Sequence, residues 1–401
     1  MAEASTITMP VIGIEDLHPD LLLAAASKAT GLADYGDMDF LEGFTLYLED
    51  LRTDAGLSES GVGNIRQDIL RMLSNRLGFV RDLTQHPEIL DEAIERPIII
   101  TGLPRTGTTK LQRMISADPG VQRLEAWRVN FPAPFPDSAV IRPDPRIVLM
   151  EQIESVLKTQ YPEMMARHPV EAREPDEEWY LMEMTFASSF SSIRTPAPRH
   201  RAWMESRSQV PVYEYLRRIL QYLQWQDGGG RGRPWVLKTP AHLGNLLELF
   251  EVFHDATLVH CHRHPNSVVA SAVSLLEAGH GIYCKHLDLR VIAMGFIDFF
   301  TKQLERNFSA RQTLGESRIV DVYYDDIRDR PLDIISDIYD RWGRRLTPEA
   351  KSALTEWNES RPEGYKGKYR NEAERIGVDR AEIEAAFADY LRRFPRLAEH
   401  D

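Results

Sequence analysis

The chain has 401 residues, 43% hydrophobic and 27% charged, which is typical of a globular protein and enough for one large α/β domain with a helical addition or for two domains. Its net charge of −13 argues against general nucleic-acid binding and requires that any anionic ligand be held by local basic residues. Two cysteines, Cys261 and Cys284, provide no disulfide framework, so we expect a reducing, cytoplasmic location. We expect neither secretion nor a membrane span, because no signal-peptide pattern or apolar run of about 18 residues is present.

Residues 1–95 are expected to form an N-terminal helical cap. Apolar side chains recur at helical spacing between Ile14 and about Glu92, and Ser58 stands where it can cap one of these helices. No group of residues in the cap has the pattern of a catalytic or ligand-binding site. The catalytic and ligand-binding residues are therefore expected in the second domain, residues 96–401.

A strand, a glycine loop and a helix follow the cap directly. Ile98–Thr101 is a short β-branched run bounded by Pro97 and Gly102, as in a fully buried parallel strand. The next residues, Gly102–Thr109, supply two glycines, a proline and three threonines, and a helical pattern starts near Lys110. Such a loop points backbone N–H groups and a helix dipole at a phosphate. The stretch therefore predicts an anion-binding site.

The loop has the beginning of a Walker A motif without its end. Gly102 and Gly107 have the required spacing, but Thr108-Thr109 follow where that motif needs Lys and then Ser or Thr. The cation lies earlier, at Arg105. A nucleoside triphosphatase would lack the lysine that contacts its β- and γ-phosphates. The loop therefore favours a nucleotide whose reactive end is not a γ-phosphate.

Residues 146–225 are expected to be a helical insertion, and its methionine and aromatic residues are interpreted mainly as core. The acidic run from Glu174 to Glu178 is interpreted as the solvated start of a helix. His168 precedes Pro169 in a predicted loop, which leaves its ring free to face a cleft.

Three further strands are predicted, each followed by a helical pattern: Trp235–Lys238, Ala256–Cys261 and Arg318–Tyr323. Strands that alternate with helices predict a parallel sheet flanked by helices. Ligands of open α/β sheets bind at the carboxyl ends of the strands. Lys238 is therefore expected at the ligand-binding edge.

The octet Gly102–Thr109, Gly-Leu-Pro-Arg-Thr-Gly-Thr-Thr, resembles the 5′-phosphosulfate loop of sulfotransferases that use 3′-phosphoadenosine-5′-phosphosulfate (PAPS). The family's 3′-phosphate motif has an Arg, a Pro two residues later and a Ser eight residues after the Arg. Arg263, Pro265 and Ser271 match these offsets, directly after a predicted strand. Lys366-Gly367 lies where relatives carry a basic residue and a glycine that close over the same phosphate.

The resemblance implies a P-loop-like sulfotransferase fold and sulfuryl transfer from PAPS. It also implies that the donor is bound by Arg105, Thr106, Gly107, Thr108, Thr109, Arg263, Ser271, Lys366 and Gly367. Sulfuryl transfer requires cations for the non-bridging oxygens and the leaving phosphate. We assign Arg105 and Lys238 to this role.

Three residues are candidates for the base that receives the acceptor proton. His242 follows Lys238 in a Lys-Thr-Pro-x-His turn similar to that of relatives, and its ordinary titration range suits a base. Glu125 lies in the region where tyrosyl-protein sulfotransferases carry a catalytic glutamate, although the chain has Trp127-Arg128 where many relatives have Trp-Glu. His168 is the third candidate. We expect His242 to be the base, with Glu125 as its rival or partner.

His260, His262 and His264 alternate, so on a strand they would share one face, with Cys261 opposite. Arg263 and Pro265 explain this segment without a metal, and no metal is expected. The expected acceptor is a small hydroxylated molecule or an amine, with phenols, alcohols, lipids, glycans and peptides all open. Two other functions are considered: a P-loop nucleotide kinase or other phosphotransferase, and a nucleotide-binding protein whose transferase site has decayed. The oligomeric state is left open.

Overall fold

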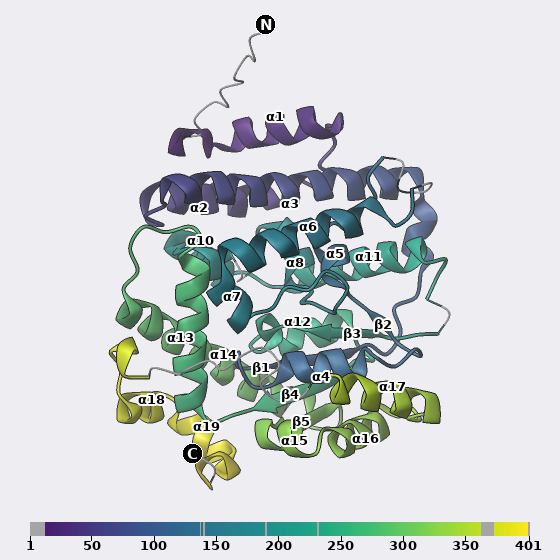
Figure 1. Ribbon diagram of the computed structural model, residues 1–401, viewed down its shortest axis with the longest axis vertical. Helices are drawn as coiled ribbons and strands as arrows, with labels where there is room; N and C mark the ends of the chain where they lie inside the picture. Colours follow the sequence, from purple (N-terminus) through teal and green to yellow (C-terminus); the bar gives the residue numbers. More distant parts are fainter. Residues whose placement is uncertain are drawn as a thin grey trace, which may run out of the picture.

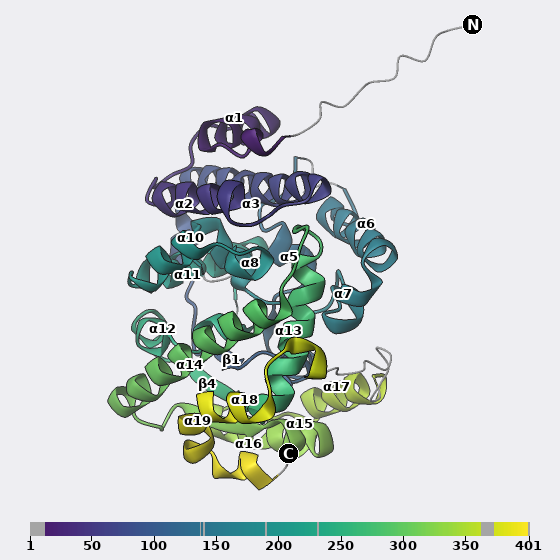
Figure 2. The ribbon, with the colours of Figure 1, turned by 90° about the vertical axis from the view of Figure 1, so that its left-hand side faces the viewer.

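The computed structural model describes residues 13–136, 138, 141–188, 191–230, 232–361 and 373–399. The N-terminal helices lie in layers over one end of the molecule, and a sheet flanked by helices forms the other end (Figures 1 and 2). Within the described part of the chain, no helix combines the length and apolar character needed to cross a membrane.

The sheet has five parallel strands in the order β2-β3-β1-β4-β5. The strands are β1 (Ile98–Gly102), β2 (Gln122–Arg123), β3 (Trp235–Lys238), β4 (Thr257–His262) and β5 (Ile319–Tyr323). The predicted α/β fold with a parallel sheet is confirmed. The short edge strand β2 was not predicted, because two residues are too few to show a period of two.

Strand register brings the predicted motifs to one edge of the sheet. β1 lies between β3 and β4, with Ile100 opposite Lys238 and Gly102 opposite Cys261. The loop after β1, Lys238 at the end of β3 and Arg263 after β4 therefore lie side by side. This carboxyl edge is where parallel α/β sheets bind ligands.

Helices cover both faces of the sheet (Figure 1). Ile98 and Ile100 point to one face, in a cluster with side chains of α4, α16 and α17, whereas Ile99 points to the opposite face. The helices after β1 are α4 (Thr108–Ile115), α5 (Ala126–Asn130), α6 (Pro145–Gln160), α7 (Pro162–Arg167), α8 (Trp179–Met182), α9 (Ser191–Arg194), α10 (Pro198–Glu205), α11 (Val210–Gln226), α12 (Leu246–Val252), α13 (Pro265–His280), α14 (Leu289–Leu314), α15 (Tyr324–Asp329), α16 (Pro331–Trp342), α17 (Pro348–Glu359), α18 (Arg380–Ala386) and α19 (Ala388–Arg393).

In the described part of the chain, three α-helices precede the sheet: α1 (Pro19–Thr30), α2 (Phe40–Thr53) and α3 (Glu59–Gln85). Ser58 caps α3, as predicted, by accepting a hydrogen bond of 2.9 Å from the N–H of Gly61. One hydrophobic cluster contains Leu73 of α3 as well as Leu237 and Leu258 of the sheet. The cap is therefore packed into the same core as the sheet, and a domain boundary at residue 95 stays a prediction.

Candidate active site

The loop after β1 has a backbone that depends on its glycines. Gly102 has φ +147°, and a Cβ there would lie 2.3 Å from the carbonyl oxygen of Cys261. Gly107, with φ +88°, is the N-cap of α4. Arg105 has φ +68°, a conformation that is strained for a residue with a side chain. The loop ends at the first turn of α4, whose N–H groups have no partner within the helix.

Arg105, Arg263 and Ser271 meet beside this loop. Nε of Arg105 donates to Oγ of Ser271 at 3.1 Å, and its NH1 donates to the carbonyl oxygen of Arg167 at 2.9 Å. Arg263 NH1 donates to the carbonyl oxygen of Arg105 at 3.0 Å. Two motifs that are about 160 residues apart in sequence therefore form one cluster.

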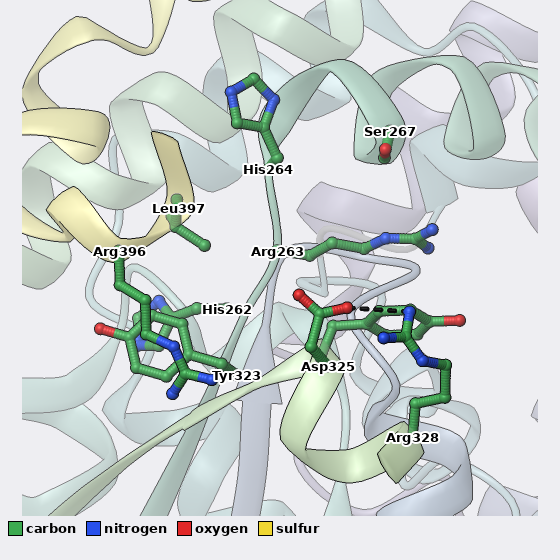
Figure 3. Close-up of a pocket in the computed structure, with 10 residues that line it drawn as sticks. His262, Arg263, His264, Ser267, Tyr323, Asp325, Arg328, Arg396 and Leu397 are labelled. Carbon is green, nitrogen blue, oxygen red and sulfur yellow. Dashed lines mark ion pairs between the residues drawn. The ribbon is translucent and has the colours of Figure 1, made fainter. Parts of the chain in front are cut away.

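A cavity of about 140 Å³ adjoins this cluster at the ends of β4 and β5 (Figure 3). The Arg263 guanidinium lies 3.9 Å from the ring centroid of Tyr324, and no carboxylate forms an ion pair with it among the described residues. Burial lowers the pKa of Arg263, with Tyr324 and Asp325 acting in the opposite direction. The lining residues are His262, Arg263, His264, Ser267, Tyr323, Tyr324, Asp325, Arg328, Arg396 and Leu397. The cavity thus combines basic side chains with two tyrosine rings.

Lys238 is buried at the end of β3, with 1% of its side chain exposed. Its Nζ contacts Oγ1 of Thr109, at 3.3 Å, and forms an ion pair with Oε1 of Glu177. Its backbone N–H donates to Oε2 of Glu178 at 2.7 Å. The strand end thus places a cation against the loop after β1 and against a carboxylate that the sequence had not marked as functional.

His242 is fully buried behind Lys238. It ends a short 3₁₀ turn, Pro240–His242, and its Nε2 lies 2.6 Å from Oε1 of Glu178. Its Nδ1 lies 2.9 Å from the hydroxyl of Tyr213. Burial, reinforced by nearby carboxylates, raises the pKa of Tyr213 well above its ordinary value, so the neutral phenol can donate to Nδ1. Both ring nitrogens are engaged, and the ring is not exposed; the role of His242 as the base stays a prediction.

The acidic run is buried, and its interpretation as a solvated helix start is wrong. Asp176, Glu177 and Glu178 are 4%, 7% and 0% exposed. The N–H of Asp176 donates to the carbonyl oxygen of Leu124 at 2.8 Å, which fixes the segment against the end of β2. Glu177 faces Lys238 and Glu178 faces His242. The Lys238 cation at Glu177, hydrogen-bond donors at Glu178 and the His168 ring near Asp176 explain how three adjacent carboxylates can be buried.

His168 lies at the same site, where its Nε2 is 3.7 Å from Oδ1 of Asp176. Burial would raise the pKa of Asp176, but His168, Lys238 and Arg113 outweigh it and hold that pKa below its usual value. His168 follows Arg167, whose carbonyl binds Arg105. The third base candidate is therefore close to the donor loop.

Glu125 adjoins the acidic run through its backbone, in a bridge with Pro175. Its carboxylate accepts a hydrogen bond of 3.0 Å from Nε of Arg123 instead of turning toward Lys238. Lys366 and Gly367, the last predicted donor contacts, lie outside the described residues.

The alternating histidines take part in a charge network. His260, His262 and Asp321 offer ligand atoms within 4.8 Å of one another, the one such metal-compatible group within the described ranges. Arg311 already occupies this group, donating to both oxygens of Asp321 at 2.8 and 2.7 Å and approaching Nδ1 of His260 at 3.3 Å. Burial lowers the pKa of both histidines. His264 is apart from them, as the N-cap of α13. A guanidinium therefore supplies the positive charge that a metal would bring.

A parallel sheet with a glycine loop, a helix N-terminus and three basic side chains at its carboxyl edge defines a P-loop-like α/β protein with an anion site. The sulfotransferase family model matches residues 97–348, more than half of the chain. The chain belongs to the sulfotransferase family.

Solved structures agree with this assignment. Sulfotransferase STF1 from Mycobacterium tuberculosis H37Rv is 28% identical, with a TM-score of 0.79 over 95% of this chain and 100% of that one. Sulfotransferase STF9 from Mycobacterium avium has the same fold, with a TM-score of 0.84, 24% identity and 98% of each chain covered. No curated protein sequence matches the chain. Family and fold favour a sulfuryl transferase over the nucleotide kinase considered above.

Proposed function

We propose that the protein transfers a sulfuryl group from PAPS to a hydroxyl group, or an amine, of a small molecule. The observation that supports this most is the contact of Arg105 with both Arg263 and Ser271. These residues come from the two separate motifs that resemble PAPS-binding sequences. A loop that bound only a 5′-phosphate would not need the second motif beside it.

In this proposal the phosphosulfate end of the donor lies on the loop, bound by Thr106–Thr109 and the first N–H groups of α4. Arg105 and Lys238 neutralise its oxygens, and both basic groups lie beside that loop. The 3′-phosphate pairs with Arg263 and Ser271, next to the cavity of Figure 3. Lys366 and Gly367 lie outside the described residues, and their contact with the donor stays a prediction from the resemblance. Positioning and charge stabilisation are the main contributions that such a transfer needs.

We also propose that transfer needs no metal ion, because Arg105 and Lys238 can neutralise the phosphosulfate and Arg311 fills the one metal-compatible group in the described part of the chain. Nucleic acid is not an expected partner of a chain with net charge −13. A reducing, cytoplasmic location is proposed from Cys261 and Cys284, which are buried and unpaired.

Two measurements test the proposal. Calorimetry should give tighter binding of 3′-phosphoadenosine-5′-phosphate (PAP) than of AMP or ATP, by about 1.5–3 kcal/mol for the charge-assisted contacts to the extra phosphate. Radiolabel should pass from [³⁵S]PAPS, and not from labelled ATP, to an acceptor. Equal affinity for PAP and AMP would contradict the proposal that PAPS is the donor. Tight PAP binding without transfer to any acceptor would support the alternative of a nucleotide-binding protein whose transferase site has decayed.

A further inference from the structure

Two buried carboxylate oxygens beside the donor loop have no hydrogen-bond partner among the described residues: Oε2 of Glu177 and Oδ2 of Asp176. A buried carboxylate oxygen without a donor is costly, so most such atoms in folded proteins are satisfied. Two such oxygens together, next to Lys238 and the loop after β1, indicate a place where a ligand supplies the missing hydrogens.

Glu177 is held in a geometry that leaves one oxygen for a substrate. Its Oε1 is fixed by the ammonium group of Lys238, whereas its Oε2 is buried and has no partner among the described residues. The same ammonium group contacts Thr109, the last residue of the loop, at 3.3 Å. Through this shared contact with Lys238, the Glu177 carboxylate lies next to the loop.

The other candidate bases are less well placed. His242 is fully buried, with both ring nitrogens engaged, and the carboxylate of Glu125 is hydrogen-bonded to Arg123. His168 faces Asp176, and its described contacts reach neither Lys238 nor the loop.

We propose that Glu177 is the general base of sulfuryl transfer, an inference that rests on the proposed function. Oε2 takes the proton of the acceptor hydroxyl while the hydroxyl oxygen forms a bond to sulfur. The bond between sulfur and the bridging oxygen of PAPS breaks, and its electron pair stays on the 5′-phosphate of PAP. The products are the sulfate ester, PAP and protonated Glu177, which passes its proton to solvent. Lys238 connects the two ends of the step, because it contacts both the base and the loop.

The inference also explains the buried acidic run. Glu178 is a positioning residue, because its two oxygens bind the backbone N–H of Lys238 and the ring of His242 and so hold both residues in place. Oδ1 of Asp176 faces the ring of His168 and accepts a hydrogen bond from the backbone N–H of Glu177. Its second oxygen, Oδ2, stays available for another polar group of the acceptor.

Glu177→Gln keeps the shape of the side chain and removes its basicity. Turnover of [³⁵S]PAPS is measured with water, phenol and 4-nitrophenol as acceptors. With water and phenol we expect a loss of about 10²–10⁴-fold, the usual contribution of a general base. With 4-nitrophenol, of which a large fraction is already ionised near neutral pH, we expect most of the activity to remain. PAP affinity, measured by calorimetry, should not weaken, because Lys238 loses an anionic competitor for the donor.

The matched control is Glu174→Gln in the same acidic run. Glu174 pairs with Arg361 at 2.5 Å and accepts from Nε1 of Trp357 at 3.3 Å, with no described contact to Lys238. Its replacement should leave turnover with every acceptor unchanged.

The outcomes separate this inference from the proposed function. If the wild-type protein binds no PAP or transfers nothing from PAPS, the proposed function is wrong, and the assignment of Glu177 as its base is wrong as well. If the wild type transfers, full activity of Glu177→Gln with water or phenol overturns the inference. So does an equal loss with phenol and 4-nitrophenol, which marks a positioning residue. His242→Gln or His168→Asn showing the selective loss instead would assign the base to that histidine.

Discussion

Replacing Arg263 by glutamine should remove the preference for a nucleotide with a 3′-phosphate. The guanidinium is partly buried over Tyr324, and its described hydrogen bond goes to a neutral carbonyl oxygen, that of Arg105. Burial lowers the pKa of Arg263, and none of the described carboxylates forms an ion pair with its guanidinium. The positive charge is therefore not balanced by a nearby anion. A 3′-phosphate would supply that anion. A charge-assisted hydrogen bond contributes about 1.5–3 kcal/mol, which is about 10- to 150-fold in the dissociation constant of PAP.

Calorimetry of the wild type and Arg263→Gln with PAP and with AMP gives a complete cycle. PAP binding should weaken by the factor above, whereas AMP binding should change little, because AMP lacks the phosphate that Arg263 contacts. Arg328→Gln is the control: Arg328 lines the same cavity but is already paired with Asp325 at 3.0 Å and Asp329 at 2.7 Å. If PAP and AMP weaken equally, Arg263 supports the loop instead of reading the 3′-phosphate, and the reasoning fails.

Three other outcomes are expected. Gly102→Ala should destabilise the loop, because its Cβ would lie 2.3 Å from the Cys261 carbonyl oxygen. The free energy of unfolding, measured in urea, should fall by at least the roughly 1–3 kcal/mol that a strained backbone costs, and PAP binding should weaken. Wild-type values of both would contradict the observed loop. Asp321→Asn should destabilise the fold, because it takes a carboxylate away from the buried Arg311 guanidinium. Breaking a buried ion pair costs about 3–5 kcal/mol, and we expect the lower end of this range because 30% of the Asp321 side chain is exposed. Arg311 and His262 hold the pKa of Asp321 well below its ordinary value of about 4 against the effect of burial, so wild-type stability is lost as pH falls below that value, and the variant should show a smaller loss in acid unfolding. Transfer from [³⁵S]PAPS should persist in EDTA; a loss that Mg²⁺ restores would contradict metal-free transfer.

The sequence predicted the sheet and its loop because their signals are local. Ile98–Thr101 is apolar and β-branched between Pro97 and Gly102, and the helix after the loop has a clear apolar face. Parallel pairing then follows from the alternation of strands and helices, and it brings Lys238 and Arg263 to the edge where the loop lies. Local patterns were sufficient here, because the strand ends position the side chains.

The acidic run could not be interpreted in the same way. Glu177 and Lys238 are 61 residues apart, and Glu178 and His242 are 64 apart. A run of carboxylates is ordinarily solvated, and only the fold reveals the cations that allow its burial. The same holds for His242, which Tyr213 covers from a helix that precedes β3. A usable signal was present: the run leads directly into Trp179, so the acidic side chains adjoin a buried helix.

The resting partners of Arg263 and Lys238 bear on how an acidic protein can keep an anion site available. The described hydrogen bond of Arg263 goes to the carbonyl oxygen of Arg105. A neutral acceptor holds this guanidinium in place without cancelling its charge, so the charge can still attract a phosphate. Lys238 differs, because its partner is the carboxylate of Glu177. An anionic donor on the loop competes with that carboxylate for one ammonium group. In the proposed function, the Lys238 ammonium group would lie between the donor on the loop and the Glu177 carboxylate, and so connect the two.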